Sequence, residues 1–426
     1  MNTLNNKTAE IISNRCVLGN KKMDATALIS LISLIEKYLK NVPFNGKDTF
    51  LSNPMILNQS NLEEYSKLTT LLNKVLKAVV SNYFHDERIR KIYQLDNELE
   101  AILRLAESTP YKIGMYRPDL IIDKNGQQKI CEIGCRYPIN GWMLSYYMNL
   151  IVNQLASSTN PNWQSVPEQT TFISTLSEDL DSNKTLFYLH NFEEGTEVYD
   201  FFNELRKQGF SIADITPDKL ELKNGVLVVE EEIATQFILE MDRESLKKIE
   251  PKILKALIES ENCLNDVRSL ILVHDKRILS VLYNQEIIGD YITKEEYDFL
   301  KRFLIPSYIL ESDQKRKMLI SSTSNWILKK NSGGKGIGSY VKNDCTPKIW
   351  ETIITNDWKN YMVQEYVAQE VFDLEHNNEK IKINIVGLLL CYNEQSFGPG
   401  IFRGSSESII NVYNGGYILP CVISNE

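Results

Sequence analysis

A glycine-rich loop after a short apolar strand is the most constraining feature of this 426-residue chain. Residues 326–341 read WILKKNSGGKGIGSYV, so apolar residues end in Lys329 and Lys330, and four glycines follow. Glycine allows backbone conformations that side chains forbid, and such a loop can direct N–H groups at an anion. The spacing is that of neither a Walker loop nor a dinucleotide-binding fingerprint. Because the next residues favour a strand, we expect the loop to join two antiparallel strands.

Two further segments bear on the choice between a phosphate-binding loop and a surface hairpin with solvated lysines. Residues 361–367 are a short apolar segment that contains Gln364 and Glu365. A strand of this kind offers the acceptor, the backbone donor and the apolar faces that an adenine ring requires. Residues 270–273 are apolar and predict a buried strand that ends next to Lys276. Together with the glycine loop, both segments favour a nucleotide site.

A predicted β-hairpin supplies paired carboxylates far upstream. Asn125-Gly126 between two alternating segments is a strong hairpin signal. If these two residues are the centre of the turn, Asp119 lies directly opposite Glu132. Two facing carboxylates, with Cβ atoms about 5 Å apart, repel each other unless a cation lies between them. The hairpin therefore predicts a magnesium site, and the alternative is an exposed hairpin whose acids are screened by water.

The motifs in this order resemble the ATP-grasp superfamily, in which two lysines, a glycine loop and a strand-end hinge hold ATP between two small lobes. By this resemblance Lys276 is the first nucleotide-binding lysine and Lys329 the second. Lys330 stands where a proline is usual, which leaves open which of the adjacent lysines contacts phosphate. The resemblance also assigns the phosphate flap to Gly333, Gly334, Lys335 and Gly336 and the adenine hinge to Gln364, Glu365 and Val367.

The resemblance assigns the magnesium ligands to Asp119 and Glu132 and a phosphate-side arginine to Arg136. Arg117 and Arg136 flank the acidic pair, as expected where metal and phosphate bind together. Gly134 departs from the family, where an asparagine usually follows the glutamate by two residues. One ligand of a second metal ion is therefore missing, and water or Asn140 could replace it.

The hairpin precedes the glycine flap, which implies circular permutation. The chain in this respect resembles the glutathionylspermidine synthase-like group, whose ending brings an arginine and an asparagine towards the phosphates. Arg403 and Asn411 match these positions. An arginine before a serine-rich turn is also typical of a solvated loop, so this alternative stays open for Arg403.

The expected fold is a circularly permuted ATP-grasp fold of the α+β and α/β classes, with a Rossmann-like domain before the ATP lobes. Apolar residues recur at helical spacing over residues 20–108. A polar linker is expected at residues 157–168, and a β-α-β unit from residue 184 to 215. The predicted divisions are residues 1–110, a helical segment; 111–165, the permuted part of the lobe with the metal hairpin; 166–269, the Rossmann-like domain; and 270–426, the remaining ATP-grasp lobes.

Composition excludes several classes of protein. A net charge of -9 argues against a nucleic-acid partner, since a surface that follows a phosphate backbone should be basic. No apolar run reaches membrane-spanning length, so no membrane association is expected. Seven scattered cysteines without metal-binding spacing predict reduced thiols of a cytoplasmic protein. The long N-terminal helices offer a contact for a homodimer.

The predicted function is ATP-dependent and Mg²⁺-dependent ligation of a small-molecule carboxylate to an amine through an acyl phosphate. The resemblance implies the reaction, and the residues themselves indicate a magnesium-nucleotide site. Arg136, Arg403 and Lys329 are the expected catalytic residues. An amino acid, a peptide or a polyamine would be the substrate. Two alternatives remain: a phosphotransferase on the same fold, and a decayed site that binds ATP without turnover.

Overall fold

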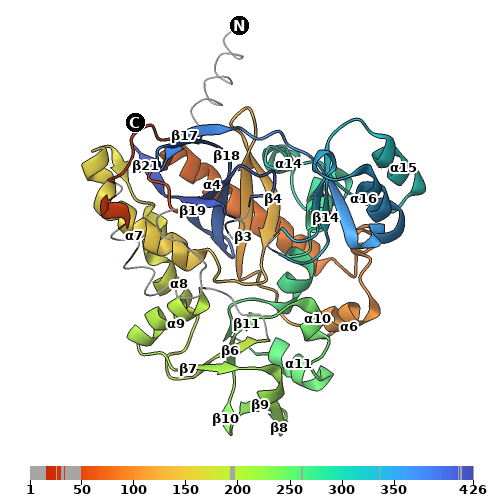
Figure 1. Cartoon of the computed structure of the whole chain (residues 1–426). Coiled ribbons are helices and arrows are strands. Elements are labelled where there is room, and N and C mark those ends of the chain that lie inside the picture. Colours follow the sequence, from red (N-terminus) through yellow and green to blue (C-terminus); the bar gives the residue numbers. More distant parts are fainter. Residues whose placement is uncertain are drawn as a thin grey trace.

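The computed structural model contains helices and strands, and its described residues form five sheets (Figure 1). The structure describes residues 16–24, 26–29, 33, 49–191, 197–260, 262–334, 336–410, 412 and 415–425.

The largest sheet has six strands and holds the predicted hairpin. Along the sheet the order is β20-β19-β18-β3-β4, with β17 also paired to β18, and all pairs are antiparallel. The strands are β3 (Met115–Ile122), β4 (Gln128–Gly134), β17 (Phe372–His376), β18 (Glu379–Tyr392), β19 (Gln395–Ser405) and β20 (Tyr417–Leu419). The hairpin β3–β4 is thus an integral part of a sheet built mainly by the end of the chain.

Alternating side chains of β18 divide the core into two parts. Leu389 and Cys391 belong to the apolar cluster that includes helix α4 (Gln59–Ser81). Leu388 and Leu390 point to the opposite face and join the cluster of α7 (Trp142–Thr159). This follows from the two-residue period of a strand, which sends successive side chains to opposite faces. Helix α4 begins at the cap residue Asn58, and its buried residues recur every three or four positions.

A second antiparallel sheet carries the glycine loop. Its strand order is β13-β16-β14-β15, and β14 pairs with β15 as expected for two strands joined by the loop. Its strands are β13 (Ser307–Ile309), β14 (Trp326–Lys330), β15 (Ser339–Val341) and β16 (Tyr361–Glu365). A separate apolar cluster includes residues of this sheet and of α15 (Asp313–Ser321) and α16 (Pro347–Thr352). The predicted antiparallel connection and the predicted strand before the hinge are both confirmed.

A parallel sheet lies at the bottom of Figure 1. Strand β6 (Leu186–His190) leads into α9 (Val198–Lys207) and then β7 (Ile212–Ile215), which pairs with β6 in parallel. The β-α-β unit is therefore confirmed. The sheet continues through β11 (Gln236–Glu240) to β12 (Asn262–Cys263). A small separate sheet holds β8 (Glu221–Lys223), β9 (Val226–Val229) and β10 (Glu232–Ile233).

The fifth sheet joins segments that are far apart in the sequence, in the order β1-β2-β21-β5. Two expectations are corrected here. Residues 157–168 are not a free linker, because α7 continues to Thr159 and Trp163 is buried in a strand that pairs with β21. Residues 20–108 are not wholly helical, because β2 falls within them. The strands are β1 (Val17–Leu18), β2 (Met55–Asn58), β5 (Trp163–Gln164) and β21 (Cys421–Ser424).

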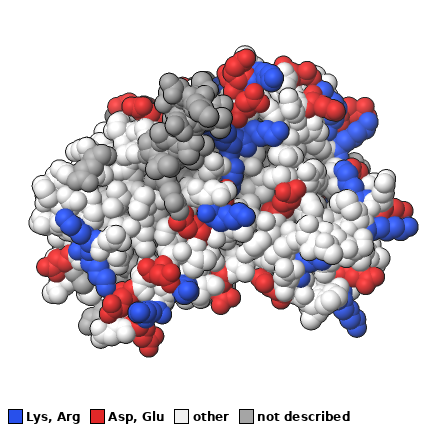
Figure 2. Space-filling view, turned by 90° about the horizontal axis from the view of Figure 1, so that it is seen from above, with Lys and Arg blue, Asp and Glu red and all other residues white. Residues whose placement is uncertain are grey.

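Shorter helices complete the fold. They are α5 (Glu87–Tyr93), α6 (Asn97–Ala106), α8 (Phe172–Glu178), α10 (Arg243–Leu246), α11 (Pro251–Ile258), α12 (Ile278–Tyr283), α13 (Gln285–Ile288) and α14 (Lys294–Lys301). Among the described helices, none combines the length and the apolar composition needed to cross a membrane. Figure 2 shows acidic and basic side chains interspersed over one face of the molecule.

Candidate functional site

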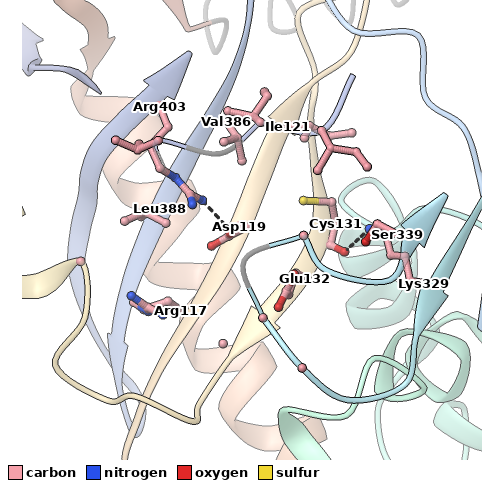
Figure 3. Close-up of a pocket in the computed structure, with 18 of the residues that line it drawn as sticks. Arg117, Asp119, Ile121, Cys131, Glu132, Lys329, Ser339, Val386, Leu388 and Arg403 are labelled. Carbon is pink, nitrogen blue, oxygen red and sulfur yellow. Dashed lines mark hydrogen bonds and ion pairs between the residues drawn. The ribbon is translucent and has the colours of Figure 1, made fainter. Parts of the chain in front are cut away.

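The hairpin and the glycine loop meet at the centre of the molecule. Lys329, on β14, donates a hydrogen bond from Nζ to the carbonyl oxygen of Cys131, on β4, at 2.7 Å. Lys276 lies 3.3 Å from Glu132 and also donates to the carbonyl oxygen of Gly333 at 3.0 Å. Figure 3 shows the carboxylates and Lys329 around one pocket. Cys131 and Lys329 are thus brought together although they lie 198 positions apart in the sequence.

A cavity of about 470 Å³ lies where these segments meet. Most of the residues that the sequence pointed to line it. They are Asp119, Glu132, Arg136, Lys329, Gly333, Gly334, Gly336, Gln364, Glu365, Val367 and Arg403. Lys276 contacts two of these residues from beside the cavity. Lys335 and Asn411 lie outside the described residues.

The facing carboxylates are confirmed, although the turn that produces them differs from the predicted one. Asp119 pairs with Glu132 across the hairpin. The turn has one more residue than expected, because Asp123 accepts hydrogen bonds from the backbone of Asn125 and Gln127. A bulge in the strand at Cys131 then shifts the register back by one residue. The extra turn residue and the bulge shift the register in opposite directions, so Asp119 still lies opposite Glu132.

Each carboxylate also has a cationic partner. Arg403 donates from Nη2 to Asp119 at 2.6 Å, and Lys276 approaches Glu132 (Figure 3 draws the first of these). Burial opposes the charged form of Glu132, but Lys276 and the other groups around this carboxylate together outweigh burial and lower the pKa of Glu132. Burial likewise disfavours the charged form of Arg403, yet Asp119 and the other groups around it together offset burial and raise the pKa of Arg403. Arg403 lies in strand β19, so it is not a solvated loop residue.

The two adjacent lysines have different surroundings. Lys329 is buried, and its Nζ also donates to Oε1 of Gln364 at 2.9 Å. Lys330 follows it in the strand and is exposed, although part of this residue also lines the cavity. Its stem packs on Gly338, where an added Cβ would lie 2.9 Å from Lys330 Cβ. Burial lowers the pKa of Lys329. Lys329 is therefore the lysine whose ammonium group is held inside the cavity.

The predicted hinge lies at one end of the cavity and is attached to the hairpin. The backbone of Glu370 donates to Ile122 at 2.9 Å, and that of Lys124 donates to Ala368 at 2.9 Å. The side chain of Gln364 is committed within the protein, since it accepts from Lys329 and donates to Ser307 at 2.9 Å. The side chain of Gln364 therefore positions Lys329.

Three positions of the glycine loop have backbone conformations that favour glycine. Gly333, Gly336 and Gly338 have φ angles of 119°, 72° and 76°. Side chains rarely adopt this left-handed region. A Cβ on Gly336 would also lie 2.9 Å from a methyl carbon of Ile409, in the segment that follows β19. The loop therefore approaches that segment at the edge of the cavity.

The segment before Lys276 is helical, which corrects the predicted strand. Residues 270–273 lie in a short π-helical turn, Ser269–Val273, and all are buried. Lys276 is instead oriented by a buried ion-pair network at the next turn. Asp275 accepts from Arg277 and from Arg243, each at 2.6 Å, and the backbone of Lys276 donates to Asn331 at 2.8 Å.

Asp275→Asn should therefore destabilise the protein, because it leaves the buried guanidinium of Arg277 and the half-buried guanidinium of Arg243 without their shared anion. Breaking a buried pair costs about 3–5 kcal/mol. Burial opposes the charge of Asp275, but Arg277 outweighs it and lowers the pKa of Asp275. This stabilisation is therefore complete above the unfolded-state pKa, about 3.9, and is lost as pH falls through the folded-state pKa. Thermal melting should show a Tm difference from wild type at neutral pH that shrinks below about pH 4.

His274 lies against the same cavity. Its Nδ1 accepts from the backbone of Cys135 at 3.4 Å, which requires that this nitrogen carries no proton. Burial, followed by Lys276, lowers the pKa of His274 to about 4. The imidazole is therefore neutral at pH 7 and adds no positive charge to the site.

Sequence reasoning missed two functional features of the site. Glu197 accepts from the backbone of Gly141 at 2.7 Å and of Leu144 at 2.8 Å, and so fixes the beginning of α7 beside the cavity. Arg117 was noted only as a neighbour of the acids, yet its guanidinium lines the cavity above Gly134. The sequence could have indicated that Arg117 lines the cavity, because Arg117 and Asp119 are alternate residues of one strand and alternate residues share a face.

The chain is similar to known proteins in sequence. A model of the AnkG N-terminal domain family matches residues 68–272. A curated relative, the ATP-grasp enzyme ankG of Aspergillus thermomutatus, is 22% identical over 433 residues, which cover 87% of this chain and 88% of the relative.

Two solved structures are also similar. One is a protein assigned as a gamma-glutamylcysteine synthetase of Methylobacillus flagellatus, with 12% identity, a TM-score of 0.40 and coverage of 80% of this chain and 83% of that one. The other is the D-alanyl-alanine synthetase A of Vibrio cholerae, with 13% identity, a TM-score of 0.29 and coverage of 49% and 68%.

The sequence similarity extends over most of the chain, and the motifs that suggested a nucleotide site converge on one cavity. Over most of its length the chain is therefore similar to an ATP-grasp enzyme.

Proposed function

We propose that the chain is an ATP-dependent, ADP-forming ligase that joins a small-molecule carboxylate to an amine. The observation that carries this proposal is the convergence of Asp119 and Glu132 with Lys276, Lys329 and the glycine loop on a single cavity. Opposed carboxylates and lysines with a flexible glycine loop are what a metal-bound triphosphate requires.

Strand β3 indicates how the nucleotide would lie. Ile121, Asp119 and Arg117 are alternate residues that line the cavity, about 7 Å apart from one to the next. The Ile121 end adjoins the hinge through the Glu370–Ile122 hydrogen bond. The base would therefore lie near Ile121 and the backbone of Val367, with the phosphates near Asp119. The substrate that receives the phosphoryl group would lie beyond them, towards Arg117.

The donor set fits Mg²⁺. This ion prefers oxygen ligands, keeps several waters and takes one or two carboxylates from the protein. Within the described part of the chain, no group of three or more histidine, cysteine or acidic side chains could hold a metal ion. Asp119 and Glu132 would therefore supply the protein's share, and the nucleotide and water the rest. When bound, the ion would neutralise charge that develops on the transferring phosphoryl group.

The chain's own residues would act by position and charge. Lys276 and Lys329 would hold the phosphate oxygens, and Arg403 and Arg136 would steady the transferring group. The substrate carboxylate would attack the γ-phosphorus, which gives an acyl phosphate and ADP. The amine would then attack the acyl carbon and release phosphate. The glycine loop, already close to Ile409, would limit entry of water to the acyl phosphate.

Circular permutation of the fold is part of the proposal. The acidic hairpin precedes the glycine loop in sequence, while β3 pairs with β18 from beyond that loop. That pairing supports an arrangement in which an early segment completes a late lobe. The substrates would be drawn from amino acids, peptides or polyamines, which provide the carboxylate and the amine.

The proposal predicts ADP and phosphate release that depends on both Mg²⁺ and a carboxylate. The purified chain would be given ATP, Mg²⁺ and pools of amino acids, dipeptides and polyamines, with hydroxylamine as a general nucleophile that converts acyl phosphates into hydroxamates. Mass spectrometry would identify the product. A phosphorylated product without amide or hydroxamate would indicate a phosphotransferase. ATP binding without turnover in any pool would indicate a decayed site.

A further inference from the structure

Two glycines make room for one arginine beside the acidic pair. Arg117 is paired with Gly134 across the hairpin. A Cβ on Gly134 would lie 3.1 Å from Nη2 of Arg117, and a Cβ on Gly141 would lie 2.8 Å from Nη1. The guanidinium therefore occupies the space that a side chain at position 134 would enter. Figure 3 shows Arg117 with Asp119 and Glu132 around the pocket.

Among the described residues, no acidic side chain accepts a hydrogen bond from this guanidinium. Its Nε is buried and has no hydrogen-bond partner among the residues that the structure describes. The nearby carboxylate of Glu197 is already bonded to the backbone of Gly141 and Leu144. Arg117 as a whole is half-buried. A buried N–H group without an acceptor is costly, and a phosphate or carboxylate oxygen in the cavity would relieve that cost.

Charges of both signs surround the cavity. The carboxylates of Asp119, Glu132, Glu197 and Glu365 line it. A fully ionised triphosphate would bring further negative charge, which a guanidinium can offset in place of a metal ion. The cationic groups at or beside the cavity are Arg117, Arg136, Lys276, Lys329, Lys330 and Arg403.

The available oxygen donors limit the number of metal ions at the acidic pair. A metal ion between Asp119 and Glu132 has two carboxylates, but position 134 offers no side-chain oxygen, and arginine nitrogens do not bind cations. Resting on the proposed function, we propose that Gly134 seats Arg117 in the phosphate region and that this guanidinium takes the place of a second metal ion. The site then binds one divalent cation for each nucleotide.

The number of bound ions tests the proposal directly. Mn²⁺ would replace Mg²⁺, and electron paramagnetic resonance would count the ions bound to the full chain with the non-hydrolysable analogue AMP-PNP. Wild type should bind one Mn²⁺ for each AMP-PNP. Gly134→Asn adds an oxygen donor and displaces the flexible end of Arg117, so it should bind two and show the spectrum of a coupled pair. Gly225→Asn is the matched control, because Gly225 has open space around it and lies outside the cavity.

Removing the guanidinium gives a second measurement that does not depend on the metal. Arg117→Ala should weaken AMP-PNP binding without metal by about tenfold, as expected for one charge-assisted contact, and Arg117→Lys should recover part of the loss. Melting curves would establish that each variant is folded. Two Mn²⁺ ions in wild type, or one in Gly134→Asn with unchanged AMP-PNP affinity in Arg117→Ala, would overturn this inference alone. No AMP-PNP-dependent Mn²⁺ binding in wild type would overturn the proposed function as well.

Discussion

Replacing Lys329 by alanine is expected to lower kcat/KM by about 100- to 1,000-fold, the effect of removing one fixed donor from a site of charge development. The ammonium group is buried in the cavity and is held by Cys131 and Gln364 at 2.7 and 2.9 Å. The substitution removes a positive charge that is fixed inside the cavity, where the proposed function places the phosphate groups. Steady-state ADP release, measured with the substrates found in the pooled assay, would give the ratio.

Lys330→Ala is the matched control for this prediction. It removes the same charge one residue away, from a side chain that is exposed. The loss should be far smaller than that of Lys329→Ala. Lys329→Met, which retains an apolar stem, separates loss of charge from loss of packing and should be about as inactive as alanine. Equal losses at the two lysines would contradict the placement of Lys329.

Changing Glu132 to glutamine should abolish most metal-dependent turnover. Glutamine has nearly the same shape but no negative charge, so Lys276 loses its anionic partner and only Asp119 of the facing pair still carries a carboxylate. Since a bound metal ion contributes several kcal/mol of transition-state stabilisation, a loss of at least about 100-fold in kcat is expected. Mn²⁺ binding in the presence of AMP-PNP should weaken in parallel.

Glu351→Gln provides the comparison, because Glu351 lies on the exposed surface of α16. It should leave both turnover and Mn²⁺ binding unchanged. Melting curves of both variants would show whether Glu132→Gln remains folded. A folded Glu132→Gln protein with wild-type turnover would remove the acidic hairpin from the proposed mechanism.

Local signals in the sequence predicted the parts of the site that depend on local geometry. The Asn-Gly pair predicted the hairpin, and alternation along it placed Asp119 opposite Glu132. The glycine loop between two strands followed from composition and from Tyr340 and Val341 after it. The added residue in the turn depends on the Asp123 side chain, which a two-residue count does not consider.

Other features depend on contacts between distant residues. Residues 270–273 are a short apolar run, and periodicity cannot distinguish a buried strand from a buried helical turn of that length. Trp163 enters a strand only because its partner β21 is near the end of the chain. The commitment of Gln364 to Lys329 and Ser307, and that of Arg403 to Asp119, likewise required the three-dimensional arrangement.

The pairing of β3 with β18 has a consequence for synthesis on the ribosome. Asp119 emerges long before Arg403, its ion-pair partner 284 positions later. Until that later segment is translated, one edge of the acidic hairpin has no neighbouring strand, and such edges invite pairing with other chains. The acidic hairpin can therefore gain its neighbouring strand and the arginine partner of Asp119 only after β18 and β19 have been translated, so a chain truncated before β18 should lack both.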